Sequence, residues 1–378
     1  MQRNILITSN NPWNITNFRM PLVNALKLRG LNPIILVPPG EDQQSLRDAG
    51  YEVITLPLSA TGLNPVKDFS CFLAYYKAMR QLKPIAMFSF TIKPAIYGSI
   101  AARLSGVPMI VSVTGLGATF IKENWISRIV DKLYKFSLPH AFRVIFENPD
   151  DHKLFLDRGY TSLAKSELVR GAGVDVKHFS PSPLPETSPP LFLLIARLLK
   201  DKGVGEFVEA AQIVKKTYPE ARFALLGSLG SGNPAEIQKE ELQEWIDKQY
   251  IEYWGTSKDV RTEISQATWV VLPSYREGLP RTLLEAASMA RPLIATDVPG
   301  CREIVLHEKN GFLCEVKNSQ SLADAMIRAC NTPAYQMQEY ASYSRHLAET
   351  HFSDVIVIGR CLEIVAEARG FSIGSAGI

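Results

Sequence analysis

The alternation of short apolar runs with longer amphipathic stretches constrains the fold more than any other feature of this 378-residue sequence. Seven apolar runs in the first half have the length of buried strands, at residues 4–9, 33–37, 52–55, 85–89, 109–113, 143–146 and 167–169. Between them, amphipathic stretches predict helices at residues 18–29, 66–82, 94–104, 125–136 and 149–157. Strands separated by helices imply a parallel sheet with right-handed crossovers, so we expect an α/β fold.

A proline-rich stretch interrupts this alternation. Five prolines lie between residues 180 and 190, where they exclude a helix interior or a central strand. The pattern then restarts, with strands expected at residues 191–196, 222–226, 251–254, 269–272 and 292–295. Because the chain is too long for one ordinary core, two domains are expected. We predict a Rossmann-like domain at 1–180, a linker at 181–190, a second Rossmann-like domain at 191–353, and a C-terminal helix with its tail at 354–378.

Composition limits the class of protein. A hydrophobic content of 46% with 21% charged residues is typical of a soluble globular chain. No window offers 18 consecutive apolar residues, and the N-terminus lacks a signal-peptide block, so a cytoplasmic protein is expected. The five cysteines are dispersed and odd in number, which favours free, mostly buried thiols.

Charge is distributed unevenly along the chain. Residues 1–180 hold 21 Lys and Arg against 13 Asp and Glu, whereas the whole chain has a net charge of only +3. A basic first half indicates an anionic partner, either a phosphate or an anionic membrane surface. Charge alone leaves nucleic acid open as well.

Several common catalytic and metal-binding patterns are absent from the sequence. There is no Asp-x-Asp pair, no histidine pair at i, i+4 and no Gly-x-Ser-x-Gly elbow. The sequence therefore predicts no metal site.

One strand-loop-helix stretch, residues 274–286, predicts an anion site. It follows the expected strand 269–272; Gly278 permits close approach of a ligand to the backbone, and Pro280 suits a first helical turn. The helix start offers amide donors and a positive dipole end. Glu277 in the loop and Glu285 in the helix are acceptors about 10 Å apart by helical rise, suited to the hydroxyls of a long polyhydroxylated anion. The alternative is that both glutamates are simply solvated or ion-paired.

Loops after other expected strands carry polar or glycine-rich residues, and in open parallel sheets ligands bind at these carboxyl ends. Arg197 and Lys202 follow strand 191–196, where they are suited to clamp a diphosphate. Further candidate loops lie at residues 10–14, 91–94, 113–120, 227–232 and 253–260. Taken singly, each also matches a surface charge or ordinary turn chemistry.

These segments together resemble one family. Glu277 and Glu285, with seven residues between them, resemble the E-x7-E signature of family 4 retaining glycosyltransferases of GT-B fold. Segments 171–175, 196–203, 254–260 and 297–300 are similar to further family segments, in the family's order. Segments 91–94, 113–117 and 146–151 resemble a bacterial subgroup of polysaccharide and lipid-linked glycan assembly, similar to undecaprenyl-diphosphate-sugar α-N-acetylgalactosaminyltransferases.

The resemblance implies a fold and a donor site. It implies two Rossmann-like domains facing across a cleft, with the C-terminal helix crossing back to the first domain. Glu277 would meet the donor sugar, Glu285 the ribose, and Arg197 with Lys202 the leaving diphosphate of a UDP-sugar, without metal or other cofactor. The further donor-binding residues it implies are Gly278, Leu279, Pro280, Arg281, Gly173, Trp254 and Gly255.

The resemblance also implies an acceptor region in the first domain. The acceptor would be a lipid-linked or other saccharide, to which a hexose or N-acetylhexosamine is transferred, and no nucleic-acid partner is implied. The implied acceptor residues are Asn11, Lys93, Thr114, Gly115, Gly117 and Asn148. Two departures leave the acceptor's identity open: 10–14 replaces a Gly-Gly loop common in the family, and Thr114-Gly115 stands where many members have a histidine.

A membrane contact and two rival functions stay open. Apolar residues recur at helical spacing over 125–136 among Lys122, Arg128, Lys132 and Lys135, which fits either an interfacial helix peripheral to the inner membrane or a core helix with a basic solvated face. The rival functions are a UDP-sugar epimerase or hydrolase and a non-catalytic nucleotide-sugar-binding protein. The former needs proton-moving carboxylates or a histidine, which the region around Thr114 does not supply.

Overall fold

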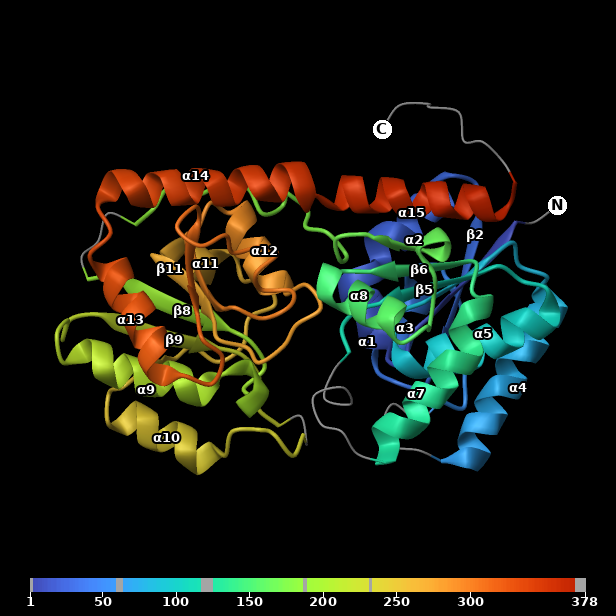
Figure 1. Cartoon of the computed structure of the whole chain (residues 1–378), viewed down its shortest axis with the longest axis horizontal. Helices are drawn as coiled ribbons and strands as arrows, with labels where there is room; N and C mark the ends of the chain where they lie inside the picture. The colour runs from blue at the N-terminus through green and yellow to red at the C-terminus, as the bar shows by residue number, and fades with distance from the viewer. Residues whose placement is uncertain (1–2, 59–63, 117–124, 186–188, 231–232, 371–378) are drawn as a thin grey trace. The chain divides into compact units, whose positions relative to one another are not determined.

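The computed structural model describes residues 3–58, 64–116, 125–185, 189–230 and 233–370. The chain forms two compact units (Figure 1). Unit 1 comprises Met1–Ala172 and Asp354–Ile378, and unit 2 comprises Gly173–Ser353. The C-terminal helix α15 (Asp354–Ala368) therefore belongs with the first unit, as predicted.

Unit 1 is built on a parallel sheet in the order β3-β2-β1-β4-β5-β6-β7. Its strands are β1 (Asn4–Thr8), β2 (Asn32–Val37), β3 (Glu52–Thr55), β4 (Met87–Ser89), β5 (Met109–Val113), β6 (Arg143–Phe146) and β7 (Ser166–Leu168). Leu6 of β1 pairs with Ile34 of β2 on one side and Met87 of β4 on the other. The strand order reverses between β1 and β4, and this switch point is where such sheets bind ligands.

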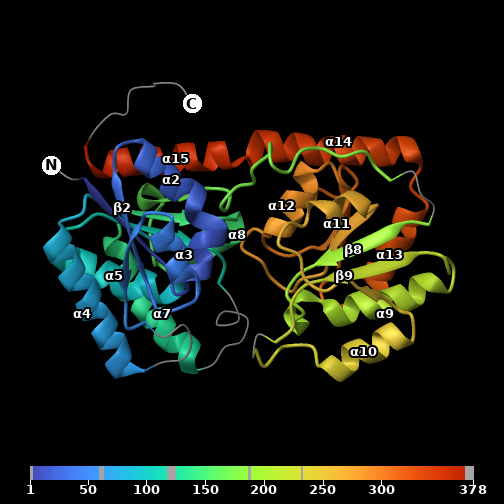
Figure 2. The ribbon, with the colours of Figure 1, turned by 180° about the vertical axis from the view of Figure 1, so that it is seen from behind.

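Helices cover both faces of the first sheet (Figures 1 and 2). They are α1 (Pro12–Asn14), α2 (Met20–Leu28), α3 (Asp42–Asp48), α4 (Pro65–Leu82), α5 (Ile92–Ser105), α7 (Trp125–Ser137), α8 (Pro149–Asp157) and α15, with short helical turns η1 (Ile15–Arg19), η2 (Leu138–His140) and η3 (Leu163–Lys165). Successive strand residues point to opposite faces. Leu6 accordingly packs with Tyr75 of α4, whereas Ile7 packs on the other face with Val23 of α2 and Ile364 of α15.

Unit 2 repeats this architecture with a parallel sheet in the order β10-β9-β8-β11-β12-β13. Its strands are β8 (Leu191–Ile195), β9 (Arg222–Leu226), β10 (Glu252–Tyr253), β11 (Trp269–Leu272), β12 (Leu293–Thr296) and β13 (Gly311–Cys314). Its helices are η4 (Lys200–Lys202), α9 (Val204–Lys215), α10 (Lys239–Asp247), α11 (Arg261–Gln266), α12 (Arg281–Ser288), α13 (Ser319–Cys330) and α14 (Ala334–His351). Phe192 of β8 packs with α9 and α13, and Leu193 packs with α12 on the opposite face. The predicted α/β class is thus confirmed in both halves.

The division between the units falls at residues 172 and 173 rather than at 180. Two arginines hold the intervening segment on unit 2. Arg345 of α14 donates to the carbonyls of Val176 and Phe179 at 3.0 and 3.1 Å. The fully buried Arg291 donates to Ser182 O at 3.2 Å and Pro183 O at 2.8 Å. The start of the proline-rich stretch is therefore fixed to unit 2, because these carbonyls obtain their hydrogen bonds there.

The structure bears on the state of the cysteines and on the length of the apolar helices. All five cysteines are free, and four of them are buried. Within the described ranges, no helix is long and apolar enough to cross a membrane.

Candidate active site

The site in unit 2 starts from the adjacency of β8 and β11. Because their carboxyl ends lie side by side, the loops that follow them meet. Gly203 has a φ of +72°, and an added Cβ would lie 2.1 Å from the carbonyl oxygen of Pro273. Tyr275 N donates to Asp201 O at 2.9 Å, which joins the two loops further. Glycine at 203 is thus required both by backbone conformation and by close packing.

Lys202, Glu277 and Ser274 form a hydrogen-bonded cluster between these loops. Lys202 Nζ lies 2.5 Å from Glu277 Oε1, and Ser274 Oγ lies 2.6 Å from the same oxygen. Both charged side chains are largely buried, with 18% and 14% exposure. In the structure Lys202 is therefore the ion-pair partner of Glu277. Both donors bind Oε1, and within the described part of the chain Oε2 accepts no hydrogen bond.

Arg197 lies in the same loop as Lys202 and is exposed. Its side chain makes no hydrogen bond or ion pair with any residue that the structure describes. The two predicted cations thus differ: Lys202 is held in place, and Arg197 is available to an anion.

Helix α12 carries the second glutamate. It begins at Arg281, and Pro280 is its N-cap residue rather than part of its first turn. Glu285 is 7% exposed and accepts a hydrogen bond from Arg281 Nε at 2.6 Å. Burial raises the pKa of the Glu285 carboxyl, while Arg281 acts in the opposite direction. The carboxylate is thus oriented in a poorly solvated place close to the helix start.

Residues 297–300 support the Glu277 loop from β12. Gly300 has a φ of +83°, and an added Cβ would lie 2.5 Å from the carbonyl oxygen of Gly278. Glu277 N donates to Pro299 O at 3.3 Å, and the Thr296 hydroxyl donates to Ser274 O. The sequence indicated this segment only as a family resemblance, and its physical role is to hold the backbone of residues 274–278.

Two of the other predicted donor residues follow a different strand of the same parallel sheet. Trp254 and Gly255 follow the edge strand β10, two strands away from β8. Trp254 Nε1 donates to Glu252 Oε2 at 3.1 Å, and Gly255 O accepts from Gly227 N at 2.8 Å. Gly173 is the first residue of the unit, next to Val174, whose amide bonds to Phe352 O at 2.8 Å. The structure therefore brings Arg197, Lys202, Glu277 and 278–285 to the carboxyl edge of the sheet. Trp254 packs against the same hydrophobic cluster as Leu283 of α12. Gly227, the hydrogen-bond partner of Gly255, lies against the backbone of Ala196 and Arg197.

In unit 1, several predicted acceptor residues have structural partners of their own. Asn11 caps α1 by accepting from Trp13 N at 2.9 Å. Asn148 is fully buried and caps α8 by accepting from Asp151 N at 2.8 Å. Lys93 pairs with Asp68 at 2.8 Å. These contacts account for all three residues without a ligand, and each also lies at a strand end near the sheet's carboxyl edge.

The remaining acceptor residues follow β5. Thr114 and Gly115 are half-buried, and Gly115 has a φ of +105°. The β1 and β4 loops meet beside them in the sheet, where Asn10 N donates to Thr91 Oγ1 at 3.0 Å. Gly117 lies outside the described residues.

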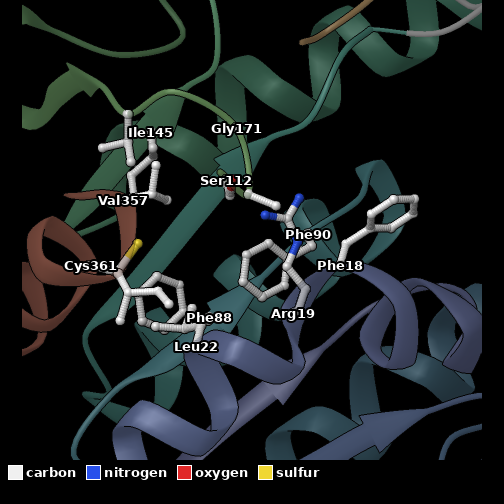
Figure 3. A pocket seen from close by; sticks show the side chains of 13 residues that line it. Phe18, Arg19, Leu22, Phe88, Phe90, Ser112, Ile145, Gly171, Val357 and Cys361 are labelled. Atoms are coloured by element: carbon white, nitrogen blue, oxygen red, sulfur yellow. The ribbon is translucent and has the colours of Figure 1, made fainter. Parts of the chain in front are cut away.

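Sequence reasoning missed a buried ion pair at the same edge of the sheet. Arg19 and Glu147 are 6% and 5% exposed, and Arg19 Nη2 lies 3.5 Å from Glu147 Oε1. The Arg19 guanidinium lies over the ring of Phe90, 4.3 Å from its centroid (Figure 3). Arg19 ends the π-helical turn η1, a distortion often found at functional sites. No motif marked Arg19, and only its position in an otherwise apolar stretch was a signal.

A small cavity adjoins Arg19. Side chains from β4, β5 and α15, among them Phe88, Ser112 and Cys361, line it with the backbone near Gly171 (Figure 3). Its volume is about 20 Å³, room for about one water molecule. It is too small for a substrate, so it marks the interior next to the carboxyl edge and not a binding pocket.

Comparisons with known proteins bear on the class. Residues 5–148 match the family model described as "Glycosyl transferase 4-like", and residues 189–332 match "Glycosyl transferases group 1". Among solved structures, a glycosyltransferase from Rickettsia africae superposes with a TM-score of 0.80 at 18% identity, covering 98% of this chain and 100% of that one. The Anabaena protein Alr3699/HepE, solved in complex with UDP, superposes with a TM-score of 0.79 at 18% identity, covering 97% and 100%. These likenesses show the fold, which is that of the GT-B glycosyltransferases.

Curated relatives are closer in sequence. An N,N'-diacetylbacillosaminyl-diphospho-undecaprenol α-1,3-N-acetylgalactosaminyltransferase from Campylobacter jejuni is 30% identical over 327 residues, covering 82% of this chain and 85% of the relative. A UDP-Gal:α-D-GlcNAc-diphosphoundecaprenol α-1,3-galactosyltransferase from Escherichia coli is 26% identical over 295 residues, covering 74% and 75%. The chain belongs to family 4 of the GT-B glycosyltransferases. It is a glycosyltransferase.

Proposed function

We propose that this glycosyltransferase moves a hexose or N-acetylhexosamine from a UDP-sugar to a sugar joined through diphosphate to a polyisoprenoid lipid. The observation that carries the proposal is the cluster of Lys202, Ser274 and Glu277 near the start of α12. Arg197 lies in the same loop as Lys202 and has no ion-pair partner among the residues that the structure describes. The acceptor class is supported by the names of the two relatives above, which both act on diphosphoundecaprenol-linked sugars.

Unit 2 has the groups that a nucleotide sugar needs. Glu277 Oε2 accepts from a donor-sugar hydroxyl while Lys202 and Ser274 fix Oε1. Arg197 and Lys202 supply positive charge for the diphosphate, together with the dipole of α12. Glu285 accepts from the ribose hydroxyls, and its burial makes such hydrogen bonds stronger than they are in water.

The reaction breaks the bond between the anomeric carbon and the β-phosphate oxygen, and the acceptor oxygen forms the new bond to that carbon. The acceptor's proton passes to the departing phosphate on the same face, so the anomeric configuration is retained and no protein nucleophile is required. Negative charge grows on the leaving UDP, where Arg197, Lys202 and the helix dipole stabilise it.

The proposed chemistry uses no metal ion. Two cationic side chains and a helix start take the charge-neutralising role that a divalent ion has in other phosphate chemistry. We expect transfer to continue undiminished in EDTA; a requirement for Mg²⁺ or Mn²⁺ would contradict this part of the proposal.

Unit 1 is the proposed acceptor-binding part. Its sequence is basic, and its carboxyl edge carries Lys93, Thr114 and the buried Arg19. Because the acceptor's lipid resides in a membrane, we propose peripheral binding to an anionic inner-membrane surface. In flotation with phosphatidylglycerol vesicles, the protein is expected to float at low salt and to be released by salt; failure to float at low salt would contradict it.

The donor class is tested by thermal shift, since a ligand that binds only the folded state raises its melting temperature. UDP and UDP-sugars are expected to raise the Tm of the wild type by several degrees. Lys202→Ala should lose most of this shift. Lys200→Ala is the matched control, because Lys200 is an exposed lysine of the same loop.

The control should retain the full shift. A response to GDP- or ADP-sugars in place of UDP-sugars would overturn the donor assignment. An unchanged UDP shift in Lys202→Ala would overturn the assigned role of Lys202.

A further inference from the structure

An open apolar groove lies on the face of unit 1 covered by α4, α5 and α7. Its volume is about 560 Å³, within the range of small-molecule sites. Two side chains from each helix line most of it: Phe69, Phe72, Tyr97, Ile100, Ile129 and Leu133. The three helices stand together on this face in Figure 1. The core beneath is complete, because Tyr75 and Tyr134 are fully buried under the same helices.

Large apolar side chains in the groove are exposed to solvent. Phe69 of α4 is 60% exposed and Ile129 of α7 is 37% exposed. The predicted interfacial stretch thus divides in the structure: Val130 and Tyr134 face the core, and Ile129 and Leu133 line the groove. The side chains of Trp125 and Ile126, and Lys122, lie outside the described residues. Grouped exposed apolar side chains of this kind mark a binding surface.

One end of the groove is polar and lies where α5 begins. Asp68 lines the groove and pairs with Lys93 at 2.8 Å, in the first turn of α5. The Tyr97 hydroxyl hydrogen-bonds the same carboxylate. Since α5 follows β4 directly, this end adjoins the carboxyl edge of the sheet, and Ile100 lies further along the helix.

Two of the helices that line the groove also carry exposed cations. Lys67, Arg128 and Lys132 are exposed on α4 and α7, and none forms an ion pair with a residue in the described part of the chain. Asp131 nearby is already paired with Lys135 at 3.2 Å. The groove therefore complements an amphiphile that has an anionic head and a long apolar chain.

We propose that this groove holds the first isoprene units of the acceptor's polyisoprenoid chain, with its diphosphate toward Lys93. The inference rests on the proposed function and adds a site that recognises the lipid itself. The groove lies in a single unit, so chain recognition does not depend on the donor site.

The test compares two soluble acceptor analogues that share one N-acetylglucosaminyl diphosphate. One carries a farnesyl chain and the other a methyl group. Binding is measured by calorimetry without donor, so the result does not depend on transfer. The variant is the double change Phe69→Ser, Ile129→Ser, and the control is Leu163→Ser on η3, where Leu163 is 74% exposed and outside the groove.

The wild type and the control should bind the farnesyl analogue at least about tenfold more tightly than the methyl one. Burying apolar surface the size of one leucine side chain already corresponds to about a tenfold change in affinity, and the farnesyl chain is larger than that. The double variant should keep its affinity for the methyl analogue and lose the preference. A preference that survives in the double variant overturns the proposal.

Other occupants give different results. If the groove binds bilayer lipid in general, the double variant loses binding to phosphatidylglycerol vesicles but keeps the farnesyl preference. If it binds a second copy of the chain, light scattering shows the double variant at half the mass of the wild type, with the preference unchanged. Either result overturns the proposal. Absence of transfer to both analogues by a wild type that prefers the farnesyl chain would instead contradict the proposed function alone.

Discussion

Glu285 shows how a single buried carboxyl links pH to ligand binding. Its pKa lies above the ordinary 4.5 because burial disfavours the charged form. Between 4.5 and the raised pKa, the folded state holds a proton that the unfolded state has lost, so the free energy of unfolding falls as pH rises through that window. In the proposed function the ribose hydroxyls bind the ionised form of Glu285, so we expect the UDP affinity to rise with pH over the same window and to level off above it.

The variant Glu285→Gln tests this directly, because glutamine does not titrate. We expect the ratio of UDP dissociation constants, variant over wild type, to be about tenfold at neutral pH, the value of a lost hydrogen bond to a charged group, and to shrink toward acid pH. Titration of UDP's own phosphate is common to both proteins and cancels in the ratio. A ratio that stays constant with pH would contradict the ribose role. Calorimetry at several pH values supplies the numbers.

Gly300 is the residue on which the geometry of the Glu277 loop depends. A Cβ at this position combines a φ of +83° with a 2.5 Å contact to Gly278 O. Gly300→Ala should therefore destabilise the protein by about 1–3 kcal/mol and weaken UDP-sugar binding. Gly30→Ala is the control, since Gly30 has a φ of +73° and open space around its Cβ position. The control should lose stability but bind UDP-sugar as tightly as the wild type. If Gly300→Ala also bound UDP-sugar as tightly as the wild type, the prediction would be contradicted, because the Glu277 loop would then tolerate displacement.

At the scale of elements, buried arginines explain where unit 2 begins. Arg291 also donates to Ile264 O at 3.0 Å and Ser265 O at 3.2 Å, so α11 and the proline-rich segment share one donor. Burial lowers the pKa of Arg291 to about 10. The guanidinium still remains charged at neutral pH, and several carbonyl oxygens accept hydrogen bonds from it.

Arg291→Met keeps the side-chain volume and removes the donors. Several buried carbonyls then lack a partner, at about 1–3 kcal/mol each, so we expect a loss of at least about 3 kcal/mol in urea unfolding. Arg222→Met is the comparison, because Arg222 pairs with Glu252 at 2.7 Å but is 49% exposed, and such pairs contribute about 1 kcal/mol or less. Similar losses in the two variants would contradict the assigned role of Arg291.

Sequence reasoning located most elements and missed specific ones for identifiable reasons. Central parallel strands such as β8 and β11 are continuous apolar runs, so their positions could be predicted from the sequence. The short polar helix α3 (Asp42–Asp48) and the π-helical start at Ile15 have no such pattern. Asn148 was assigned to the acceptor, although an asparagine followed by proline is also a typical helix start, which is what it forms.

At the scale of the whole molecule, the candidate site was predictable by residue but not by contact. Glu277, Glu285, Arg197 and Lys202 were all indicated by their loops, because parallel strands deliver successive loops to one edge. The pairing of Lys202 with Glu277 could not be predicted, because it joins residues 75 positions apart and depends on close packing at Gly203. The Arg19–Glu147 pair was equally inaccessible, because its partners are 128 positions apart.

We propose that the protein binds a UDP-sugar in unit 2 and a lipid-linked sugar in unit 1. A binding measurement with only one of these substrates does not show that the sugar is transferred to this acceptor. The decisive observation is therefore the product of both substrates together.

The most direct test incubates the full-length protein with UDP-sugars and an undecaprenyl-diphosphate-linked N-acetylglucosamine in EDTA, and follows the lipid-linked product by mass spectrometry and NMR. On the proposed function, we expect one hexose or N-acetylhexosamine to be added with retained anomeric configuration. We also expect Lys202→Ala to lower the rate by about 10²- to 10³-fold and Lys200→Ala to leave it unchanged. Transfer only with a divalent metal, an inverted product, or an undiminished rate in Lys202→Ala would contradict this account.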